Sequence, residues 1–384
     1  MRRVAIVGAG MTDFRSMIPL TSPEMIRLAV KRCLDDVGGL SIRHVDGVLA
    51  TSAPDAFDGY HDKGAIAVEA AGAIGKPITR VFVGGGSGVA AGVAGWYHVA
   101  SGAFDTLLVV AWEKMSHPYP HAQKLFQTIF DPVLEKPLGP NLIWIFALEM
   151  MRYMEAHGLK KELIAEVAVK NKRNALDHPH AQLGARITVD DVLNSEVLVW
   201  PVNRLDISPT SDGAVALLLA SEEVAKKLTD NPVWIEGVAT CLDSQFWTSR
   251  DLAYPYYVYL AAQTAYRMAK IASPLKEVDV WEPYDPFTYK ELHHMDGLLG
   301  RPGLAPKLLA EGQMERDGDC PTSPSGGLLG VGNPIAAAGL MKVAELYYQL
   351  SGRAGKRQVP DAEVGVAQAW GDLMQVGTVV VCRR

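Results

Sequence analysis

Cysteine is scarce in this chain of 384 residues, which contains four: Cys33, Cys241, Cys320 and Cys382. They lie far apart and never form a Cys-x-x-Cys pair, which argues against a disulfide framework and a self-contained zinc site. We therefore expect a reducing, cytoplasmic compartment. The neighbouring His178 and His180 have no cysteine or carboxylate at ligand spacing, so we expect no metal there.

Long basic runs and long apolar runs are also missing. No Lys/Arg block exceeds a pair and the formal net charge is -6, so nucleic acid is not an expected partner. No apolar run reaches the roughly 20 residues that a membrane helix requires, and we expect no membrane attachment. The hydrophobic content of 48% instead predicts a folded globular protein with a large core.

A glycine-rich turn stands out in residues 81–91, where an apolar run meets five small residues and an Ala/Gly-rich segment follows. This pattern predicts a buried strand, a tight turn and a closely packed helix whose first N–H groups converge at one point. Such a turn often presents a nucleophile. Here it offers only Gly84, Gly85, Gly86, Ser87 and Gly88.

Strand and helix patterns alternate along the chain, and the second half repeats the first in outline. Strands are predicted at residues 4–7, 45–48, 105–112, 212–219, 233–238 and 278–281, with a last pair within 364–381. Helices are predicted at residues 22–37, 63–74, 143–157, 162–176, 257–271 and 335–350, and another from about 289. Two βαβαβ-like halves imply a duplicated α/β architecture, with ligands at the carboxyl ends of strands near the junction.

One segment, residues 116–142, is too long and too rich in proline and aromatic residues to be a simple connection. We expect it to be a lid or an interface loop. The predicted organisation is an N-terminal half at 1–115, this excursion and its helix at 116–160, the remainder of the N-terminal half at 161–222, and a C-terminal half at 223–384.

Five groups of motifs support one resemblance. They are Ser101-Gly102 with Glu113-Lys114-Met115-Ser116; residues 171–175 with Pro179 and Ala181-Gln182; residues 208–214; Tyr284-Asp285-Pro286-Phe287; and residues 323–327 through Gly332-Asn333-Pro334 to Gly339. Jointly they resemble the thiolase superfamily, in its sterol-carrier-type and archaeal branch, over nearly the full length. The resemblance implies the thiolase fold, a five-layered αβαβα structure of two similar halves that is normally dimeric.

The chain departs from a working thiolase at its catalytic positions. The match of Ser87-Gly88 to the family's Cys-x-Ser-Gly motif places Gly85 where the nucleophilic cysteine belongs, and Asn333 replaces the histidine that activates it. The family's second catalytic cysteine is also missing: its position falls in residues 368–372, which read Gln-Ala-Trp-Gly-Asp. Tyr284 stands at the remaining catalytic position, where the family has His or Asn. Thiolysis and Claisen condensation need a thiolate and its base, so acyl transfer by this route is disfavoured.

Among thiolase-like proteins, the chain resembles most the bacterial steroid side-chain-cleaving aldolases, which share the triple-glycine turn and a Tyr-Asp-x-Phe motif. The resemblance implies a carbon–carbon lyase, a retro-aldolase acting on a β-hydroxyacyl-CoA in lipid or steroid catabolism. Coenzyme A would be part of the substrate, with no permanently bound cofactor. Expected partners are a second copy of the chain, forming a homodimer, and a small OB-fold protein with a zinc ribbon. The aldolases carry a second tyrosine near the position of Asn333, which this chain lacks.

The resemblance also assigns the site. We expect Tyr284 and Asn333 to be catalytic, with Asp285 in support. Backbone N–H groups are expected to hold the substrate oxyanion at Gly85, Gly86, Ser87, Gly327 and Gly371. The excursion at 116–142 would then cover the acyl pocket and contact the partner.

Several alternatives remain open from the residues alone. Tyr284 needs a cationic or hydrogen-bonding neighbour to act as a base at neutral pH, and it could instead be a satisfied core tyrosine. Asp285 could cap the helix from Tyr289. We expect His293 and His294 to be solvated or interfacial. Either core packing or an apolar substrate could use the aromatic cluster of Phe246, Trp247, Tyr254, Tyr256, Tyr257 and Tyr259.

Two other functions compete with the lyase. One is an acetyl-CoA acyltransferase of thiolase type that finds its nucleophile elsewhere. The other is a non-catalytic scaffold that binds acyl-CoA.

Overall fold

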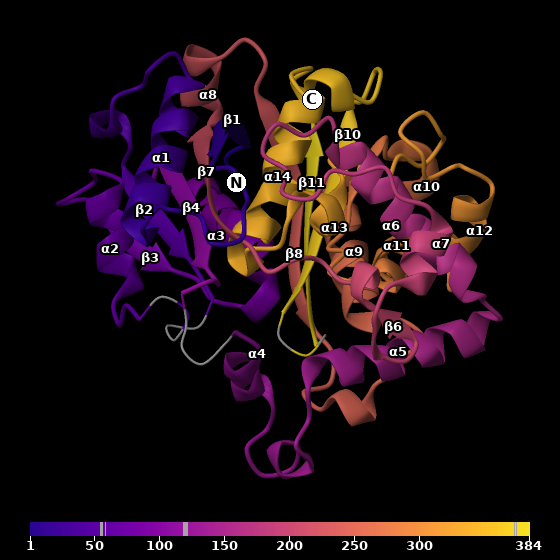
Figure 1. The fold of residues 1–384 in the computed structure, drawn as a ribbon. Coiled ribbons are helices and arrows are strands. Elements are labelled where there is room, and N and C mark those ends of the chain that lie inside the picture. The colour runs from indigo at the N-terminus through magenta and orange to yellow at the C-terminus, as the bar shows by residue number, and fades with distance from the viewer. Residues whose placement is uncertain (54–56, 58, 118–121, 372, 374) are drawn as a thin grey trace.

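The structure is a computed structural model that describes residues 1–53, 57, 59–117, 122–371, 373 and 375–384 (Figure 1). Residues 118–121 of the predicted excursion lie outside the described residues, as does Asp372 of the predicted second-cysteine stretch.

One nine-stranded mixed sheet runs through the molecule in the order β3-β2-β4-β7-β1-β8-β11-β10-β9. The N-terminal half supplies β1 (Val4–Met11), β2 (Gly47–Thr51), β3 (Ile78–Arg80), β4 (Thr106–Lys114) and β7 (Asp212–Ser221). The C-terminal half supplies β8 (Val233–Leu242), β9 (Val280–Glu282), β10 (Val364–Gly371) and β11 (Val376–Arg383). A separate two-stranded ribbon consists of β5 (Val197–Val199) and β6 (Val202–Asn203).

The order of the strands shows the duplication directly. In the first half β2 is parallel to β4, which pairs antiparallel with β7, and β7 pairs antiparallel with β1. In the second half β9, β10, β11 and β8 repeat this sequence of directions. The two halves join where β1 pairs with β8, at Ala5 with Trp234 and Ile6 with Val233. The predicted repeat is therefore present.

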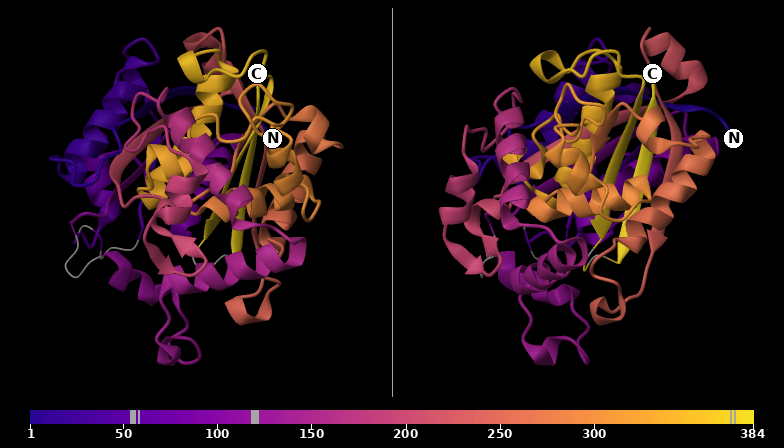
Figure 2. Two further views of the ribbon diagram at one scale, coloured as in Figure 1. Left: turned by 45° about the vertical axis from the view of Figure 1, so that its right-hand side comes forward. Right: turned by 90° about the vertical axis from the view of Figure 1, so that its right-hand side faces the viewer.

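Two helices, α3 (Ser87–Ala100) and α14 (Ile335–Leu350), pack against each other and against strands of both halves. On the opposite face of the N-terminal strands lie α1 (Ser22–Asp35), α2 (Lys63–Ala70) and α8 (Glu222–Leu228). The opposite face of the C-terminal strands is covered by α9 (Tyr256–Ala269), against which α11 (Thr288–Leu299) packs. The strands of the two halves thus lie on either side of α3 and α14, which gives the predicted five layers, αβαβα (Figure 1); Figure 2 shows the same molecule turned.

Alternating side chains fill the spaces between these layers. In β4, Leu107 and Val109 join the core that contains α3 and α14, whereas Leu108 and Val110 join the core beneath α1. Successive strand residues point to opposite faces, and both faces are covered here, which explains why the strand reads as one continuous apolar run.

The remaining helices lie beside and below the sheet. They are α4 (Ala122–Leu125), α5 (Leu142–His157), α6 (Lys161–Ala175), α7 (Val189–Asn194), α10 (Pro274–Glu277), α12 (Ala305–Ala310) and α13 (Gly327–Val331). The described part of the excursion, which contains α4, projects from the body of the molecule in every view (Figures 1 and 2). None of the described helices combines the length and apolar character needed to cross a membrane.

The predicted buried strand before the glycine turn is wrong in position and in burial. The edge strand β3 ends at Arg80, and Phe82 is 45% exposed. Val81 N still donates to Ala50 O of β2 at 3.1 Å, and after two further residues Gly84–Gly86 form a single 3-10 turn before α3. An apolar run cannot distinguish a strand from such a segment.

Candidate functional site

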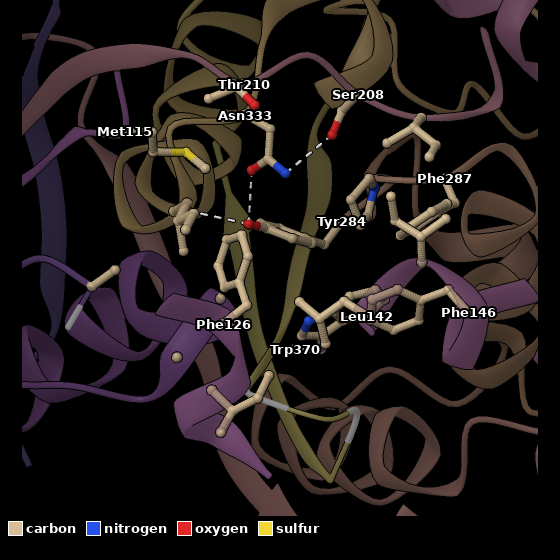
Figure 3. Close-up of a pocket in the computed structure, with 18 of the residues that line it drawn as sticks. Met115, Phe126, Leu142, Phe146, Ser208, Thr210, Tyr284, Phe287, Asn333 and Trp370 are labelled. Atoms are coloured by element: carbon tan, nitrogen blue, oxygen red, sulfur yellow. Dashed lines mark hydrogen bonds between the residues drawn. The ribbon is translucent and has the colours of Figure 1, made fainter. Parts of the chain in front are cut away.

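A pocket opens where the glycine turn, the start of α14, the segment between β9 and α11, and the excursion converge (Figure 3). The volume that the centres of water-sized molecules can occupy in it is about 130 Å³. The pocket is lined by Ala53, Gly84, Gly85, Met115, Leu125, Phe126, Ile129, Leu142, Ile143, Phe146, Ile207, Ser208, Pro209, Thr210, Tyr284, Pro286, Phe287, Asn333, Ile335 and Trp370. A water molecule needs about 10–15 Å³ by the same measure, so a small acyl group fits. Most of these side chains are apolar.

Tyr284 is the one ionisable side chain among these described lining residues. It follows β9, is 2% exposed, and donates a hydrogen bond of 3.0 Å from its hydroxyl to Asn333 Oδ1. The Ile335 carbonyl oxygen lies 3.3 Å from the same hydroxyl. The structure thus brings together the two residues predicted to be catalytic.

The environment of Tyr284 keeps its hydroxyl protonated. Burial first, and then the charges of Glu113 and Asp285, raise the pKa of this phenol well above its ordinary value of 10.0. Of the two kinds of neighbour predicted to activate Tyr284, a cationic or a hydrogen-bonding one, the described lining provides the second: Asn333 Oδ1 and Ile335 O, which both accept from the hydroxyl. Tyr284 is therefore a neutral phenol that donates a hydrogen bond to Asn333. It can accept a proton from a substrate only as it gives up its own.

Asn333 is held from two sides in the loop before α14. Its backbone N–H donates to Ser211 Oγ at 3.0 Å, and its side-chain Nδ2 donates to Ser208 Oγ at 3.1 Å. Ser208 and Thr210 also line the pocket. The amide therefore presents its Oδ1 to Tyr284 in a fixed orientation.

The glycine turn reaches the pocket through Gly84 and Gly85. Ser87 does not line it: its buried Oγ accepts from Val83 N at 2.9 Å and donates to Gly84 O at 2.6 Å, which ties the turn together. The N–H of Gly86 donates to Val83 O at 2.9 Å. Of the predicted oxyanion donors in this turn, only Gly85 faces the pocket.

The two remaining predicted donors are also absent from the lining. Gly327 N donates to Ser325 Oγ at 3.2 Å, and its φ of 59 is one that few other residues adopt. Gly371 ends β10 opposite Val376. Both glycines serve close backbone packing in the described structure.

Asp285 has a structural setting one residue beyond Tyr284. Phe287, and not Asp285, precedes α11, so the predicted capping of that helix is wrong. Asp285 instead accepts from Leu328 N at 2.8 Å at the start of α13 and pairs with Lys342 at 3.0 Å. Burial raises the pKa of Asp285 to about 6, against the lowering effect of Lys342.

His293 and His294 are fully buried, so the prediction that they are solvated or interfacial is wrong. His294 lies behind the pocket, where Nδ1 is 2.7 Å from the Tyr284 carbonyl oxygen and Nε2 is 3.0 Å from the Tyr257 hydroxyl. Burial lowers the pKa of His294 well below 6.5. A neutral ring with its proton on Nδ1 satisfies both contacts, because a carbonyl can only accept.

The four cysteines all lie away from the described pocket lining. Cys33, Cys320 and Cys382 are buried, and burial raises the pKa of each thiol, that of Cys320 to about 12. They are consequently poor nucleophiles. Within the described residues, no group of three His, Cys, Asp or Glu is placed to hold a metal ion.

The aromatic residues of the pocket come from other segments than the predicted cluster around Tyr257. Phe126 belongs to the excursion, Phe146 to α5 and Trp370 to β10. Phe126 lies in the excursion predicted to cover the acyl pocket, and Trp370 lies within the stretch of the family's second cysteine, whereas Phe146 carried no sequence signal. The predicted cluster contributes no residue to the described lining, and Tyr257 packs behind it against His294.

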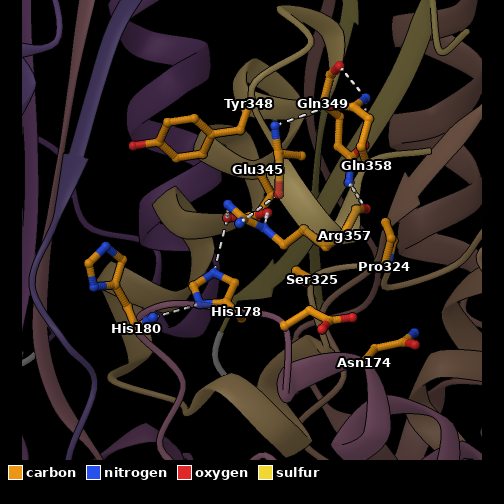
Figure 4. Close-up of polar contacts among 12 residues, drawn as sticks. Asn174, His178, His180, Pro324, Ser325, Glu345, Tyr348, Gln349, Arg357 and Gln358 are labelled. Atoms are coloured by element: carbon orange, nitrogen blue, oxygen red, sulfur yellow. Dashed lines mark hydrogen bonds and ion pairs between the residues drawn. The ribbon is translucent and has the colours of Figure 1, made fainter. Parts of the chain in front are cut away.

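A second polar cluster lies outside the pocket, around Glu345 of α14 (Figure 4). Arg357 Nε contacts Glu345 Oε2 at 2.7 Å, and His178 Nε2 lies 3.0 Å from Glu345 Oε1. His178 Nδ1 accepts from His180 N at 3.1 Å, so His178 links its loop to α14, whereas the His180 ring lies 2.9 Å from Asp13 Oδ1.

The comparison with protein families now places this fold and pocket. The thiolase N-terminal domain matches residues 4–223 and the thiolase C-terminal domain-like family matches residues 240–384. The chain belongs to the thiolase superfamily, in its sterol-carrier-type branch.

Individual relatives agree with this placement. An acetyl-CoA acetyltransferase of Methanothermobacter thermautotrophicus is 31% identical, covering 95% of each chain. Human sterol carrier protein 2 is 29% identical over 95% of this chain and 69% of its own length. A solved structure described as an Ltp2-ChsH2(DUF35) aldolase superposes with a TM-score of 0.85 at 24% identity, covering 98% of this chain and 97% of that one. Human mitochondrial 3-ketoacyl-CoA thiolase gives a TM-score of 0.74 at 17% identity, covering 100% and 99%.

Proposed function

We propose that this protein is a carbon–carbon lyase that cleaves a β-hydroxyacyl-CoA by a retro-aldol reaction. The observation that carries the proposal is the pairing of Tyr284 with Asn333 beside a side-chain-free Gly85. A proton-transferring phenol occupies the pocket, and none of the described lining residues is a cysteine or a histidine.

The chemistry needs one proton to move from oxygen to carbon. The β-hydroxyl loses its proton, its oxygen forms a carbonyl, and the Cα–Cβ bond breaks with its electron pair left on the thioester as an enolate. As the enolate forms it takes a proton at Cα, giving a shorter acyl-CoA and a ketone or aldehyde. Because the neutral Tyr284 phenol cannot hold two protons, it delivers its own proton to Cα as it accepts the hydroxyl proton, so the reaction gains and loses no proton overall.

Asn333 supports this exchange by orienting the phenol. Its Oδ1 accepts the Tyr284 hydroxyl proton at 3.0 Å, and its Nδ2 is itself held by Ser208. An amide oxygen is too weak a base to remove the proton. It therefore fixes the direction of the hydroxyl and leaves the lone pairs of the phenol oxygen for the substrate.

The pocket also indicates the kind of acyl group. Phe126, Leu125 and Ile129 of the excursion face Phe146 and Phe287 across it, and no described lining residue carries a charge at neutral pH. Burying an unpaired charge there would cost several kcal/mol. We therefore propose an uncharged, apolar acyl group, with the excursion as its cover.

The acetyl-CoA acetyltransferases among the relatives offer the competing function. Acyl transfer through the enzyme needs a thiolate in the pocket, and position 85 has no side chain to supply it. This difference favours the lyase. An acyl-CoA-binding scaffold would need neither the phenol nor its oriented partner.

We further propose a homodimer and an OB-fold partner with a zinc ribbon. The aldolase structure with a similar fold is described with two components in its name. In this chain, the projecting excursion exposes Val133 by 75%, Leu134 by 60% and Leu138 by 66%. Neighbouring exposed apolar side chains of this kind are suited to contact another protein.

The test is to incubate the chain, alone and with a co-expressed partner, with β-hydroxyacyl-CoAs in D₂O. We expect mass spectrometry to show a shorter acyl-CoA carrying one deuterium at Cα and an equal amount of ketone or aldehyde. An acyl group attached to the protein, with no carbonyl product, would contradict the lyase and support acyl transfer.

A further inference from the structure

The indole N–H of Trp370 is a polar group for which the pocket provides no acceptor. Trp370 is 5% exposed and lines the pocket, and within the described part of the chain its Nε1 donates no hydrogen bond. A buried indole N–H normally has a partner. An unused donor that faces a substrate pocket is therefore available to a ligand.

The position of this donor is set by Gly85. A Cβ placed on Gly85 would lie 3.2 Å from Trp370 Nε1 and 3.1 Å from the Trp370 carbonyl oxygen. The donor thus borders the space that a side chain at position 85 would fill. With glycine there, a substrate oxygen can approach the N–H.

The indole ring is held on several sides (Figure 3). Phe146 stacks on it with ring centroids 5.3 Å apart, Tyr284 lies at 5.8 Å, and His294 meets it edge-on at 5.1 Å. A donor fixed in this way needs no reorganisation when charge develops on a nearby oxygen. Because the ring centroid of Trp370 lies 5.8 Å from that of Tyr284, both side chains border the same small pocket.

A cation beneath the ring strengthens the donor. Lys290 Nζ lies 4.5 Å from the centroid of the Trp370 ring and 2.5 Å from its ion-pair partner, Glu149. A positive charge on the face of an indole ring is attracted by its π electrons and draws them toward itself. The N–H at the ring edge becomes a better hydrogen-bond donor.

We propose that Trp370 Nε1–H is a catalytic hydrogen-bond donor to the thioester carbonyl oxygen, and that this bond strengthens as the oxygen becomes the enolate oxygen. The inference rests on the proposed lyase function and deepens it. Tyr284 moves the proton, and Trp370 stabilises the charge that moves onto the thioester.

The kinetic test compares Trp370→Phe with wild type on a β-hydroxyacyl-CoA that wild type cleaves. Phenylalanine keeps an aromatic ring but removes the donor, so we expect kcat to fall about 100-fold while KM changes less than about threefold. Trp247→Phe is the matched control, because Trp247 is also buried with an unpartnered Nε1 but does not line the pocket. Its kcat should stay within about twofold. A kcat for Trp370→Phe within about twofold of wild type would overturn the inference.

A second readout does not depend on turnover. The indole ¹H–¹⁵N signal of Trp370, assigned by its absence in Trp370→Phe, is followed while hexanoyl-CoA is added. This thioester has the carbonyl but no β-hydroxyl, so it cannot be cleaved. We expect the indole proton to shift downfield, and saturation without a shift, or failure to bind, overturns the inference. If wild type cleaves no β-hydroxyacyl-CoA but the signal shifts, the lyase proposal fails and the hydrogen bond stands.

Discussion

Gly88 of α3 and Gly339 of α14 are in backbone contact at the centre of the molecule. A Cβ placed on Gly88 would lie 2.1 Å from Leu340 N, 2.2 Å from Ala336 O and 2.6 Å from the carbonyl carbon of Gly339. The two helices of the central layer can approach this closely only without a side chain at position 88. Their crossing fixes the start of α3 and, with it, Gly85 at the pocket.

A substitution at this crossing should therefore cost stability. We expect Gly88→Ala to lower the free energy of unfolding by about 3 kcal/mol, because backbone atoms must move apart. Gly92→Ala is the control on the same helix: its Cβ would meet Val380 at 3.7 Å and Val343 at 3.8 Å, which is ordinary contact. It should be neutral or stabilise by up to about 1 kcal/mol. Urea unfolding measures both, and equal effects would contradict the packing argument.

Restoring a thiol at position 85 should not restore acyl transfer. In Gly85→Cys the new Cβ would lie 3.2 Å from Trp370 Nε1, and the described lining offers the thiol neither a histidine nor a carboxylate, while the Tyr284 phenol stays protonated at neutral pH. We expect the intact mass of this variant to stay unchanged after incubation with acetyl-CoA at pH 7. A gain of one acetyl group on the introduced thiol, absent from wild type, would show that the pocket still activates a nucleophile.

The pKa of Tyr284 predicts the pH dependence of cleavage. Burial raises the pKa above 10.0, so the phenol keeps its proton through pH 7 to 9. If the neutral phenol is the active form, kcat should be constant over this range. A pH–rate profile checks this, and a tenfold rise per pH unit would instead identify the phenolate as the active form.

The Glu345 cluster predicts a stability effect with a defined pH window. Arg357, followed by His178, holds the pKa of Glu345 far below 4.5 despite its burial. Its contribution is therefore present above pH 4.5 and is lost as the pH falls below it. At pH 7, Glu345→Gln should cost about 3–5 kcal/mol, because Arg357 stays buried without its charge partner.

Urea unfolding of Glu345→Gln at several pH values measures this contribution. The difference from wild type should shrink as the pH falls from 4.5 toward 3. Glu155→Gln is the control, since Glu155 pairs with Arg152 at an exposed site, and it should cost less than about 1 kcal/mol. A pH-independent difference for Glu345→Gln would contradict the assignment.

The fold could be predicted largely from apolar patterns and motifs. The strands that became β4, β7 and β8 are long apolar runs, and the two-half repeat follows from their order. The prediction at 81–83 is wrong because these apolar residues follow the end of β3 and are at most partly buried, and of the three only Val81 donates a backbone hydrogen bond to β2. An apolar run indicates that a segment is buried, but whether it pairs as a strand depends on which segment the tertiary structure places beside it.

The site could be predicted only in part. The motifs of the family resemblance indicated Tyr284, Asn333 and Gly85, and these three meet in the pocket. The resemblance also implied oxyanion donors at Gly327, in a matching motif, and at Gly371, in the stretch of the missing second cysteine, but neither lines the described pocket. His294 was misplaced because a histidine on a helix carries no sequence signal for burial. Its hydrogen-bond partners are the Tyr284 carbonyl oxygen, in the segment before α11, and the Tyr257 hydroxyl, on α9.

The central claim is that Tyr284 transfers the proton in carbon–carbon cleavage, and a single-turnover rate tests it most directly. Tyr284→Phe keeps the ring and removes the hydroxyl, while Tyr266→Phe is the control, because Tyr266 is buried, bonds to Leu298 O and does not line the pocket. We predict that wild type and Tyr266→Phe release a ketone or aldehyde at similar rates, and that Tyr284→Phe is slower by at least tenfold, about 1.4 kcal/mol of barrier. Cleavage by Tyr284→Phe at the wild-type rate would contradict the account.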